Sequence, residues 1–284
     1  ILLEKKTKIK RFKLNSEQSE AIKFLKKENR KFDVSVLQGV TGSGKTIVYF
    51  ERVKEIIRKK KQALIMLPEI FLTNDFKSRL EDFFGFEPAI WHSKITPKKK
   101  RIIWKGVINN KIKVVIGARS ALLLPFKKLG IIVVDEEHDT SYKQDSGVIY
   151  NARDMAISRA NFESIPIHLI TSIPSIETFN NIQNKKYRHF KITKRFENFP
   201  LPETRIVNLN IGRIKNKFIS EETIELVKDF LNKGQQVLFF INRRGFAPYL
   251  ICKNCGKKQS CSNCSLYLTF HKIKKKAICH HCSF

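Results

Sequence analysis

Long apolar runs are absent from this chain of 284 residues. Nowhere does it reach the roughly 18 consecutive apolar residues that a membrane-spanning helix needs, and its N-terminus lacks the basic-then-apolar pattern of a secretory signal. These absences exclude the membrane-embedded and secreted classes, so we expect a soluble, cytoplasmic protein with no membrane partner. The first residue is Ile1 rather than Met, and we therefore expect further residues upstream.

Cysteine is absent until Cys252, after which the six cysteines follow as three C-x-x-C pairs. Their clustering excludes a secreted disulfide scaffold and favours a metal-binding module in a reducing compartment. Two such pairs supply the four thiolates of a tetrahedral Zn²⁺ site, although the spacing alone does not decide which pairs combine. The predicted zinc ligands are Cys252, Cys255, Cys261, Cys264, Cys279 and Cys282.

Acidic residues are scarce: 26 Asp and Glu stand against 55 Lys and Arg, for a net charge of +29. Such an excess is typical of proteins with a polyanionic partner such as nucleic acid. An alternative stays open, because lysine, phenylalanine, isoleucine and asparagine share AT-rich codons and the chain contains 22 Phe. A strongly AT-biased genome would produce much of the same excess, so the case for nucleic-acid binding rests on the motifs.

A glycine-rich loop follows the apolar run at 34–37 and precedes a helical stretch at 45–60. That context is what a phosphate-binding loop needs, because glycines let backbone N–H groups turn inward and the helix N-terminus adds a positive dipole end. Lys45 can reach the β- and γ-phosphate oxygens of ATP, and the Thr46 hydroxyl can ligate Mg²⁺. The predicted nucleotide-binding residues are Gly39, Val40, Thr41, Gly42, Ser43, Gly44, Lys45 and Thr46.

A second chemical signal stands where the apolar run 130–134 meets an acidic segment, Asp135-Glu136-Glu137-His138. A buried parallel strand is typically a continuous apolar run, and carboxylates at its carboxyl end lie where open α/β sheets bind ligands. We predict that Asp135 holds Mg²⁺ and that Glu136 orients or deprotonates the attacking water. With Lys45, they form the predicted catalytic set.

Apolar strands and helical stretches alternate along most of the chain. Strands are expected at 34–37, 63–67, 113–117, 130–134 and 166–171. Helices are expected at about 45–60, 71–84, 97–109, 151–163 and 175–183. This alternation predicts an α/β fold with a parallel sheet covered by helices on both faces.

Local signals set the expected starts and the boundary of this region. Ser16 is the expected N-cap of a first helix, and Thr96-Pro97 is a cap followed by a first-turn proline. Pro200 and Pro202 mark a domain boundary. Beyond it we expect a strand near 205–209, a helix near 220–232 and a strand at 237–241.

Several of these motifs occur together in one known family. The acidic segment is the Asp-Glu-x-His form of motif II in superfamily 2 helicases. With LPEI at 67–70, IGARSAL at 116–122, NRRGFAP at 242–248 and the cysteine pairs, the chain closely resembles the PriA family of bacterial replication-restart DNA helicases. The resemblance runs from about Leu14 to Phe284.

That resemblance implies a particular organisation of the chain. It implies a basic linker at 1–13, a RecA-like, ATP-binding helicase lobe at 14–200 and the start of a second RecA-like lobe at 201–250. A zinc-binding module follows at 251–284, and we expect it to be incomplete. Nothing after residue 245 resembles the later helicase motifs that supply an arginine finger, so we expect either a fragment or a truncated gene product.

The resemblance also implies roles for residues outside the phosphate-binding loop. Gln18 stands where superfamily 2 enzymes often read the adenine, although an exposed glutamine at a helix start is an equal alternative. The DNA-coupling candidates are Arg119, Ser120, Tyr142, Lys143 and Thr171. Tyr142 and Lys143 belong to an aromatic-rich loop that would stack on unpaired bases, or else Tyr142 packs on the sheet edge.

One motif departs from the family pattern. The family has Ser-Ala-Thr-Pro in motif III, where this chain has Thr171-Ser172-Ile173-Pro174. The hydroxyl expected at Ile173 is missing, so strand separation is a weaker expectation than ATP binding. In the zinc module, the family pairs Cys261, Cys264, Cys279 and Cys282 in one site, which leaves Cys252 and Cys255 without partners here.

The function that these resemblances imply is an ATP-dependent 3′–5′ DNA helicase with Mg²⁺ and Zn²⁺ as metal ions. Its partners would be forked or single-stranded DNA, other primosome proteins and single-stranded-DNA-binding protein. An ATP-driven translocase that does not unwind DNA is one alternative. The alternative from another class is a fork-binding primosome scaffold with residual ATP binding.

Overall fold

A computed structural model describes residues 14–27, 32–68, 71, 73–93, 95–144, 148–195, 200, 202–207, 219–240, 250–252, 254–264, 267–271 and 276–279. The chain divides into two compact units, Ile1–Pro202 and Glu203–Phe284, and each unit is described by itself. Among the described residues, no helix is both long and apolar enough to cross a bilayer.

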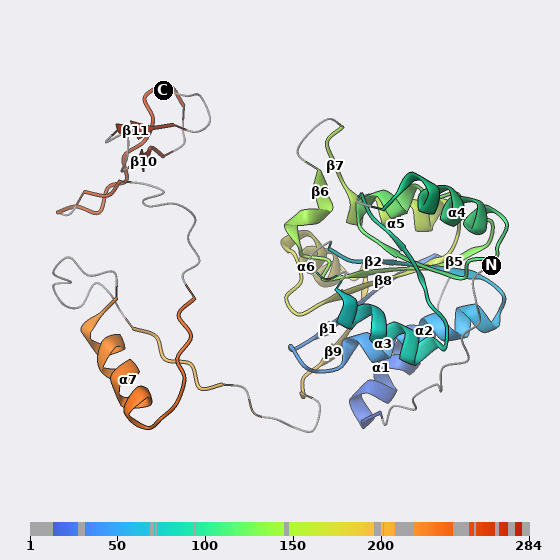
Figure 1. Cartoon of the computed structure of the whole chain (residues 1–284), viewed down its shortest axis with the longest axis horizontal. Helices are drawn as coiled ribbons and strands as arrows, with labels where there is room; N and C mark the ends of the chain where they lie inside the picture. Colours follow the sequence, from blue (N-terminus) through green and yellow to red (C-terminus); the bar gives the residue numbers. More distant parts are fainter. Residues whose placement is uncertain are drawn as a thin grey trace. The chain divides into compact units, whose positions relative to one another are not determined.

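The first unit is built on a seven-stranded sheet in the order β3-β4-β2-β5-β8-β1-β9, and every neighbouring pair is parallel (Figure 1). The strands are β1 Asp33–Gly39, β2 Gln62–Met66, β3 Ala89–Trp91, β4 Val114–Gly117, β5 Leu129–Asp135, β8 Pro166–Thr171 and β9 Arg188–Ile192. The predicted α/β fold with a parallel sheet is confirmed, because five of these strands coincide with the apolar runs.

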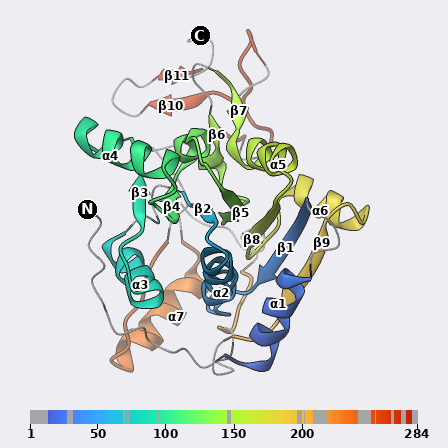
Figure 2. The same cartoon turned by 90° about the vertical axis from the view of Figure 1, so that its right-hand side faces the viewer.

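Helices cover both faces of the sheet. The helices are α1 Ser16–Lys26, α2 Lys45–Arg58, α3 Asn74–Phe84, α4 Pro97–Ile108, α5 Ala152–Phe162 and α6 Ile176–Gln183, with 3-10 turns η2 Arg119–Leu123 and η3 Thr140–Tyr142. Helices α1 to α3 lie on one face, and α4 and α5 lie on the other (Figures 1 and 2).

The expected helix caps are partly confirmed. Thr96 caps α4 and Pro97 occupies its first turn, as predicted. The expected cap at Ser16 is wrong: Asn15 caps α1, because its side chain accepts from the backbone N–H of Gln18 while the Gln18 side chain accepts from the backbone N–H of Asn15. This reciprocal arrangement satisfies two N-terminal donors, whereas Ser16 already belongs to the helix.

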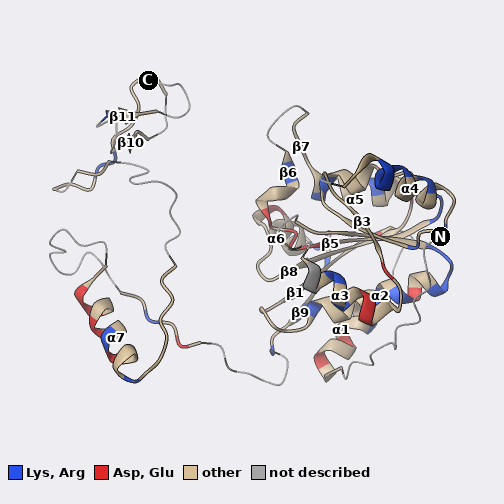
Figure 3. Ribbon diagram, viewed as in Figure 1, with Lys and Arg blue, Asp and Glu red and all other residues tan. Residues whose placement is uncertain are grey.

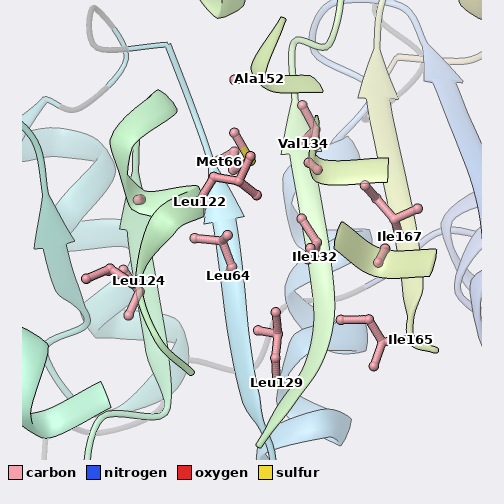
Figure 4. Close-up of a cluster of buried hydrophobic side chains, with 14 of the residues drawn as sticks. Leu64, Met66, Leu122, Leu124, Leu129, Ile132, Val134, Ala152, Ile165 and Ile167 are labelled. Atoms are coloured by element: carbon pink, nitrogen blue, oxygen red, sulfur yellow. The ribbon is translucent and has the colours of Figure 1, made fainter. Parts of the chain in front are cut away.

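Two apolar clusters, one on each face of the sheet, form the core of this unit. Figure 4 shows part of the cluster beneath α4 and α5, where Leu64 and Met66 of β2 lie beside Ile132 and Val134 of β5. Every residue of β5 is buried. Because burying one such side chain contributes roughly 1.5–3 kcal/mol, these strands fix the position of the loops at their carboxyl ends.

Between β5 and α5, the chain forms a separate antiparallel hairpin of β6 Lys143–Gln144 and β7 Tyr150–Asn151. It projects away from the sheet in Figure 1. The hairpin, β3 and β9 are elements that the sequence analysis did not expect.

The second unit has little regular structure among its described residues. It contains α7 Glu221–Asn232, as expected, and a hairpin of β10 Thr269–His271 and β11 Lys276–Ile278. The expected strands near 205–209 and at 237–241 are wrong for the described residues 202–207 and 237–240, which form no strand. A strand needs a neighbour to pair its backbone groups, and no described segment of this unit pairs with them.

Charge is distributed unevenly over the elements. Basic residues are concentrated on α4, whose sequence PKKKRIIWKGVI has no acidic residue, whereas α7 contains several acidic ones (Figure 3). The sequence NRRGFAP at 242–248 lies outside the described residues.

Candidate nucleotide site

The glycine-rich loop and the acidic segment meet at the carboxyl edge of the parallel sheet. The loop connects β1 to α2, and the acidic segment follows β5, with only β8 between those two strands. A cavity of about 570 Å³ opens there. Its lining residues are Thr41, Gly42, Gly44, Lys45, Thr46, Ile47, Phe50, Arg79, Asp82, Phe83, Asp135 and Glu136.

Backbone geometry explains the glycines of the loop. Gly42 and Gly44 have φ angles of 81° and 78°, in the left-handed region that other residues rarely adopt. Gly44 is also the N-cap of α2. The first N–H groups of that helix, which have no partner within it, therefore lie at the end of the loop. The hydroxyl of Ser43 is buried and has no hydrogen-bond partner among the described residues. Such a buried donor suits an anionic ligand held by the loop.

Lys45 lies at the start of α2 and is 8% exposed. Its ammonium donates a hydrogen bond of 2.7 Å to the Gly39 carbonyl, so it is held across the loop. Burial lowers the pKa of Lys45 below its usual range, although the nearby charges of Glu136 and Asp135 act in the opposite direction. The Lys45 side chain is therefore a buried cation facing two carboxylates.

Asp135 is buried at the end of β5. Its Oδ2 accepts a 2.8 Å hydrogen bond from the Tyr49 hydroxyl, and its Oδ1 accepts from the backbone N–H of Glu136. Burial raises the pKa of the Asp135 carboxyl to about 6, and the Tyr49 hydrogen bond offsets part of that rise. A carboxylate fixed at both oxygens beside a cavity is well placed to hold a cation.

Glu136 lines the same cavity with its backbone in the left-handed region, at a φ of 48°. For a residue other than glycine this geometry costs about 1–3 kcal/mol and is typical of functional sites. Its carboxylate lies 3.6 Å from His138 Nδ1. The same nitrogen lies 2.8 Å from the Thr171 hydroxyl, at the end of β8.

Residues 15–172 match the DEAD/DEAH box helicase family. The chain belongs to that family. It is 45% identical over 293 residues to the replication restart protein PriA of Rickettsia felis, which covers 100% of this chain and 45% of that relative. It is 41% identical over 251 residues to PriA of Haemophilus influenzae, covering 88% of this chain and 34% of that relative. These matches confirm the resemblance to the replication-restart proteins.

The fold also resembles solved helicase structures. The helicase MrfA has a TM-score of 0.54 at 22% identity, over 82% of this chain and 36% of that chain. This likeness shows the fold alone. The chain spans less than half the length of the curated relatives it matches.

The segment expected as motif III begins at Thr171, the last residue of β8, and its contacts bear on the change at Ile173. Thr171 is buried, and its hydroxyl donates to the Ile173 carbonyl and contacts His138. The Ile173 side chain is 72% exposed. A link between motif II and motif III therefore exists through Thr171, and the missing hydroxyl at Ile173 does not interrupt it.

Gln18 is buried against the phosphate-binding loop. Its amide nitrogen donates 3.0 Å to the Ser43 carbonyl, and its oxygen accepts from the backbone N–H of Asn15. The alternative of an exposed glutamine at a helix start is wrong, because the side chain is 0% exposed. Adenine recognition by Gln18 stays a prediction.

The DNA-coupling candidates divide into buried and exposed groups. Ser120 and Lys143 are exposed, and Arg119 donates 2.9 Å to the Lys143 carbonyl. Tyr142 is 1% exposed, and its hydroxyl donates 2.7 Å to the backbone carbonyl of Asp135. This burial agrees with the alternative of a packed tyrosine, because stacking on bases needs an exposed ring face. A role of Tyr142 in DNA coupling stays a prediction. The hydrogen bond of Tyr142 to Asp135 joins η3, the turn that precedes the hairpin, to the nucleotide site.

Three cysteines of the second unit form a cluster. The sulfur atoms of Cys261, Cys264 and Cys279 all lie within 4.8 Å of one another, and the Sγ atoms of Cys264 and Cys279 are 3.4 Å apart. Sulfurs around a tetrahedral zinc ion lie about 3.8 Å apart, given zinc–sulfur distances of about 2.3 Å. The cluster therefore fits a metal ion. Cys282, the expected fourth ligand, lies outside the described residues, and Cys252 and Cys255 are exposed.

Three residues near the nucleotide site were missed by the sequence analysis. Tyr49 stands one helical turn after Lys45, a spacing that can reveal a shared helix face. Arg79 of α3 lines the main cavity and a neighbouring one of about 240 Å³ that reaches Thr73. Glu137 is buried beside the catalytic candidates. No local pattern marks Arg79, whose position depends on how α3 packs. Glu137 stands in the predicted acidic segment, but its partners Ser175 and Thr178 come from a distant helix and its cap.

Proposed function

We propose that this chain is the ATP-binding motor part of a 3′–5′ DNA helicase of the PriA type, which acts at stalled replication forks. The observation that carries the proposal is the meeting of Lys45, Asp135 and Glu136 in one cavity at the carboxyl edge of the sheet. The similarity to replication restart proteins along the whole chain supports it.

In this proposal the loop residues Gly39–Thr46 hold the phosphates of ATP, and the buried Ser43 hydroxyl is one of the donors. Lys45 offsets the charge of the β- and γ-phosphates. Thr46 and Asp135 would hold Mg²⁺, which neutralises charge on the phosphates when bound. Glu136 orients the attacking water and accepts its proton, and Gln18 reads the adenine beside the loop.

The partners follow from the same similarity. We propose that forked or single-stranded DNA, other primosome proteins and single-stranded-DNA-binding protein bind the whole protein in the cytoplasm. Arg119, Ser120, Lys143 and Thr171 would couple DNA to the nucleotide site, with Tyr142 acting through Asp135. Zn²⁺ would occupy the cysteine cluster.

We further propose the domain limits that the sequence predicts. They are a linker at 1–13, a first RecA-like lobe at 14–200, the start of a second lobe at 201–250 and a zinc module at 251–284. An ATP-driven translocase uses the same site, and an unwinding assay would separate it from a helicase. The fork-binding scaffold is less well supported, because it needs no strained Glu136 beside a phosphate-binding loop.

The experiment compares two variants of the whole protein that contains this chain. Lys45→Ala should abolish ATP hydrolysis while the fold stays intact, because no other described cation of the loop can replace the ammonium. Glu136→Gln should retain ATP binding and block turnover. ATP hydrolysis at the parental rate in Lys45→Ala would show that the nucleotide site is assigned wrongly.

A further inference from the structure

Glu137 is a buried carboxylate that the proposed ATP chemistry does not use. Its side chain is fully buried, and it accepts hydrogen bonds from four donors. The backbone N–H of Ser175 donates at 2.8 Å, the Ser175 hydroxyl at 3.1 Å, the Thr178 hydroxyl at 2.9 Å and Arg153 Nη1 at 3.2 Å. A carboxylate with this many partners is held in one orientation.

These donors join three segments that are distant in the sequence. Glu137 follows β5, Arg153 lies in the first turn of α5, and Ser175 is the N-cap of α6. Arg153 also donates a hydrogen bond of 2.6 Å to the Ser175 hydroxyl and one of 2.8 Å to the Asp154 carboxylate. Its guanidinium therefore contacts several members of the network at once. The network therefore connects the motif II segment to the residues that directly follow motif III.

The residue before Glu137 is the proposed catalytic base, Glu136, with its backbone in the left-handed region. Such a conformation persists only where neighbouring structure fixes it. On one side, the Glu136 backbone N–H donates to Asp135 Oδ1. On the other side, the backbone N–H of Glu137 donates 3.1 Å to the Ile170 carbonyl of β8, and the Glu137 side chain is anchored by its four donors.

We propose that Glu137 is a positioning residue: its buried network with Arg153, Ser175 and Thr178 holds the carboxylate of Glu136 at the nucleotide cavity and ties it to motif III. This inference rests on the proposed function, since it assigns Glu136 as the base. A displacement of the motif III segment would shift Ser175 and, through its hydrogen bonds to Glu137, the backbone of Glu136. The network thus provides a second link between the two motifs, beside the contact of His138 with Thr171.

The test uses Glu137→Gln, which keeps the shape of the side chain and removes its charge, and Thr178→Val, which removes one donor. Turnover of ATP is measured in the whole protein, and binding of a fluorescent ADP analogue is measured as well. We expect the turnover number to fall roughly ten- to hundredfold in Glu137→Gln, because small displacements of a catalytic group have effects of that size. Thr178→Val should show a smaller loss in the same direction, and both variants should bind the ADP analogue within about twofold of the parent.

A matched control separates positioning from general stability. Asp33 accepts from Arg188 at the opposite, amino end of the sheet, so Asp33→Asn breaks an ion pair of the same unit far from Glu136. It should lower the melting temperature and leave the turnover number unchanged. A parental turnover number in Glu137→Gln would overturn the inference, and so would an equal loss in Asp33→Asn at an equal drop in melting temperature.

The outcome for Glu137 is distinguishable from the outcome for the proposed function. If Lys45→Ala and Glu136→Gln abolish turnover while Glu137→Gln does not reduce it, the site stands and the positioning role fails. If Lys45→Ala retains turnover, the proposed function fails.

Discussion

The two units of the chain are stabilised in different ways. In Ile1–Pro202, a parallel sheet buries continuous apolar strands under helices on both faces. In Glu203–Phe284, the buried cluster of the described residues consists of Cys261, Leu268 and Cys279, and α7 has no buried residue. The first unit can derive its stability from apolar burial, whereas the second has too little apolar core among its described residues.

Small modules without a sufficient core need another source of stability, and a structural metal is a common one. Two of the three buried side chains among the described residues of the second unit are the thiols of Cys261 and Cys279, which belong to the cysteine cluster. We therefore expect that the first unit is folded by apolar burial, whereas the cysteine module of the second unit depends on a bound metal ion.

The largest effect is expected when the metal ion is removed from the second unit. Removing zinc with a chelator should unfold the cysteine module, because structural zinc contributes roughly 10–16 kcal/mol near neutral pH. The first unit should keep its unfolding transition. Circular dichroism and thermal unfolding, measured before and after chelation, check this. Loss of both units together would contradict the separation.

Metal analysis and thiol counting test which cysteines bind the metal ion. The 284-residue chain should bind one zinc ion, with Cys261, Cys264, Cys279 and Cys282 protected from thiol reagents. Cys252 and Cys255 should react, since both are exposed and the backbone N–H of Cys255 lowers the pKa of the Cys252 thiol. Two tightly bound ions, or protection of Cys252 and Cys255, would refute this pairing.

The next largest effect is expected from a substitution that weakens the apolar core of the first unit and leaves the cysteine module intact. Leu64→Ala removes a fully buried side chain from the centre of β2, and should destabilise the first unit by about 2–5 kcal/mol. Zinc content should stay at the parental value. Leu231→Ala on α7, where the side chain is 55% exposed, is the control and should change stability by less than about 0.5 kcal/mol. A matching loss in both variants would show that α7 is packed.

The difference in apolar burial between the two units also explains which elements the sequence could predict. In the first unit, β5 and the phosphate-binding loop were predictable because a buried parallel strand is apolar throughout and glycine marks the turn. Strand β9, Arg188–Ile192, was not, because it pairs only with β1 at the sheet edge, and its first four residues alternate between half-buried and exposed, with only Ile192 buried. Edge strands need no continuous apolar run.

The site shows a similar limit. Lys45, Asp135 and Glu136 were predictable because each stands at a fixed offset from a strand end. The burial of Tyr142 was predictable only as one of two alternatives, because the residue types of the loop after Glu136 do not show that it turns back and places that ring against the core. In the second unit, the apolar residues 237–240 predicted a strand, but no segment that the structure describes pairs with them, and Leu238 is 91% exposed.

The third prediction concerns a polar exception inside the apolar unit. His168 of β8 is fully buried, and neither ring nitrogen has a hydrogen-bond partner among the described residues. Burial, with the nearby charges of Arg52 and Arg188, lowers the pKa of His168 to about 3. The folded state therefore keeps the ring neutral, while the unfolded chain takes up a proton below about pH 6.5. Stability is lost as the pH falls from about 6.5 towards 3.

His168→Leu should remove this pH dependence. Between pH 7 and pH 4.5 the parent should lose about 2–3 kcal/mol more stability than the variant, measured by urea unfolding at each pH. His189→Leu is the control, because that ring is exposed and bonds to Gln38; its effect should be smaller. An unchanged pH dependence in His168→Leu would mean that the buried ring is charged or hydrated in the folded state.

The smallest effect is expected at the nucleotide site, from a hydrogen bond to the buried carboxylate of Asp135. The Tyr49 hydroxyl is the side-chain donor to Asp135 Oδ2, and Tyr49→Phe removes it without changing the ring. A single hydrogen bond of this kind contributes about 1–2 kcal/mol, so unfolding without ligand should become easier by that amount. Because Asp135 is then less well oriented, Mg²⁺ should also increase ADP affinity less than in the parent. Tyr187→Phe, whose ring packs against the cluster under α5, should leave the Mg²⁺ effect unchanged. An unaltered Mg²⁺ effect in Tyr49→Phe would show that Asp135 is held by its backbone contacts alone.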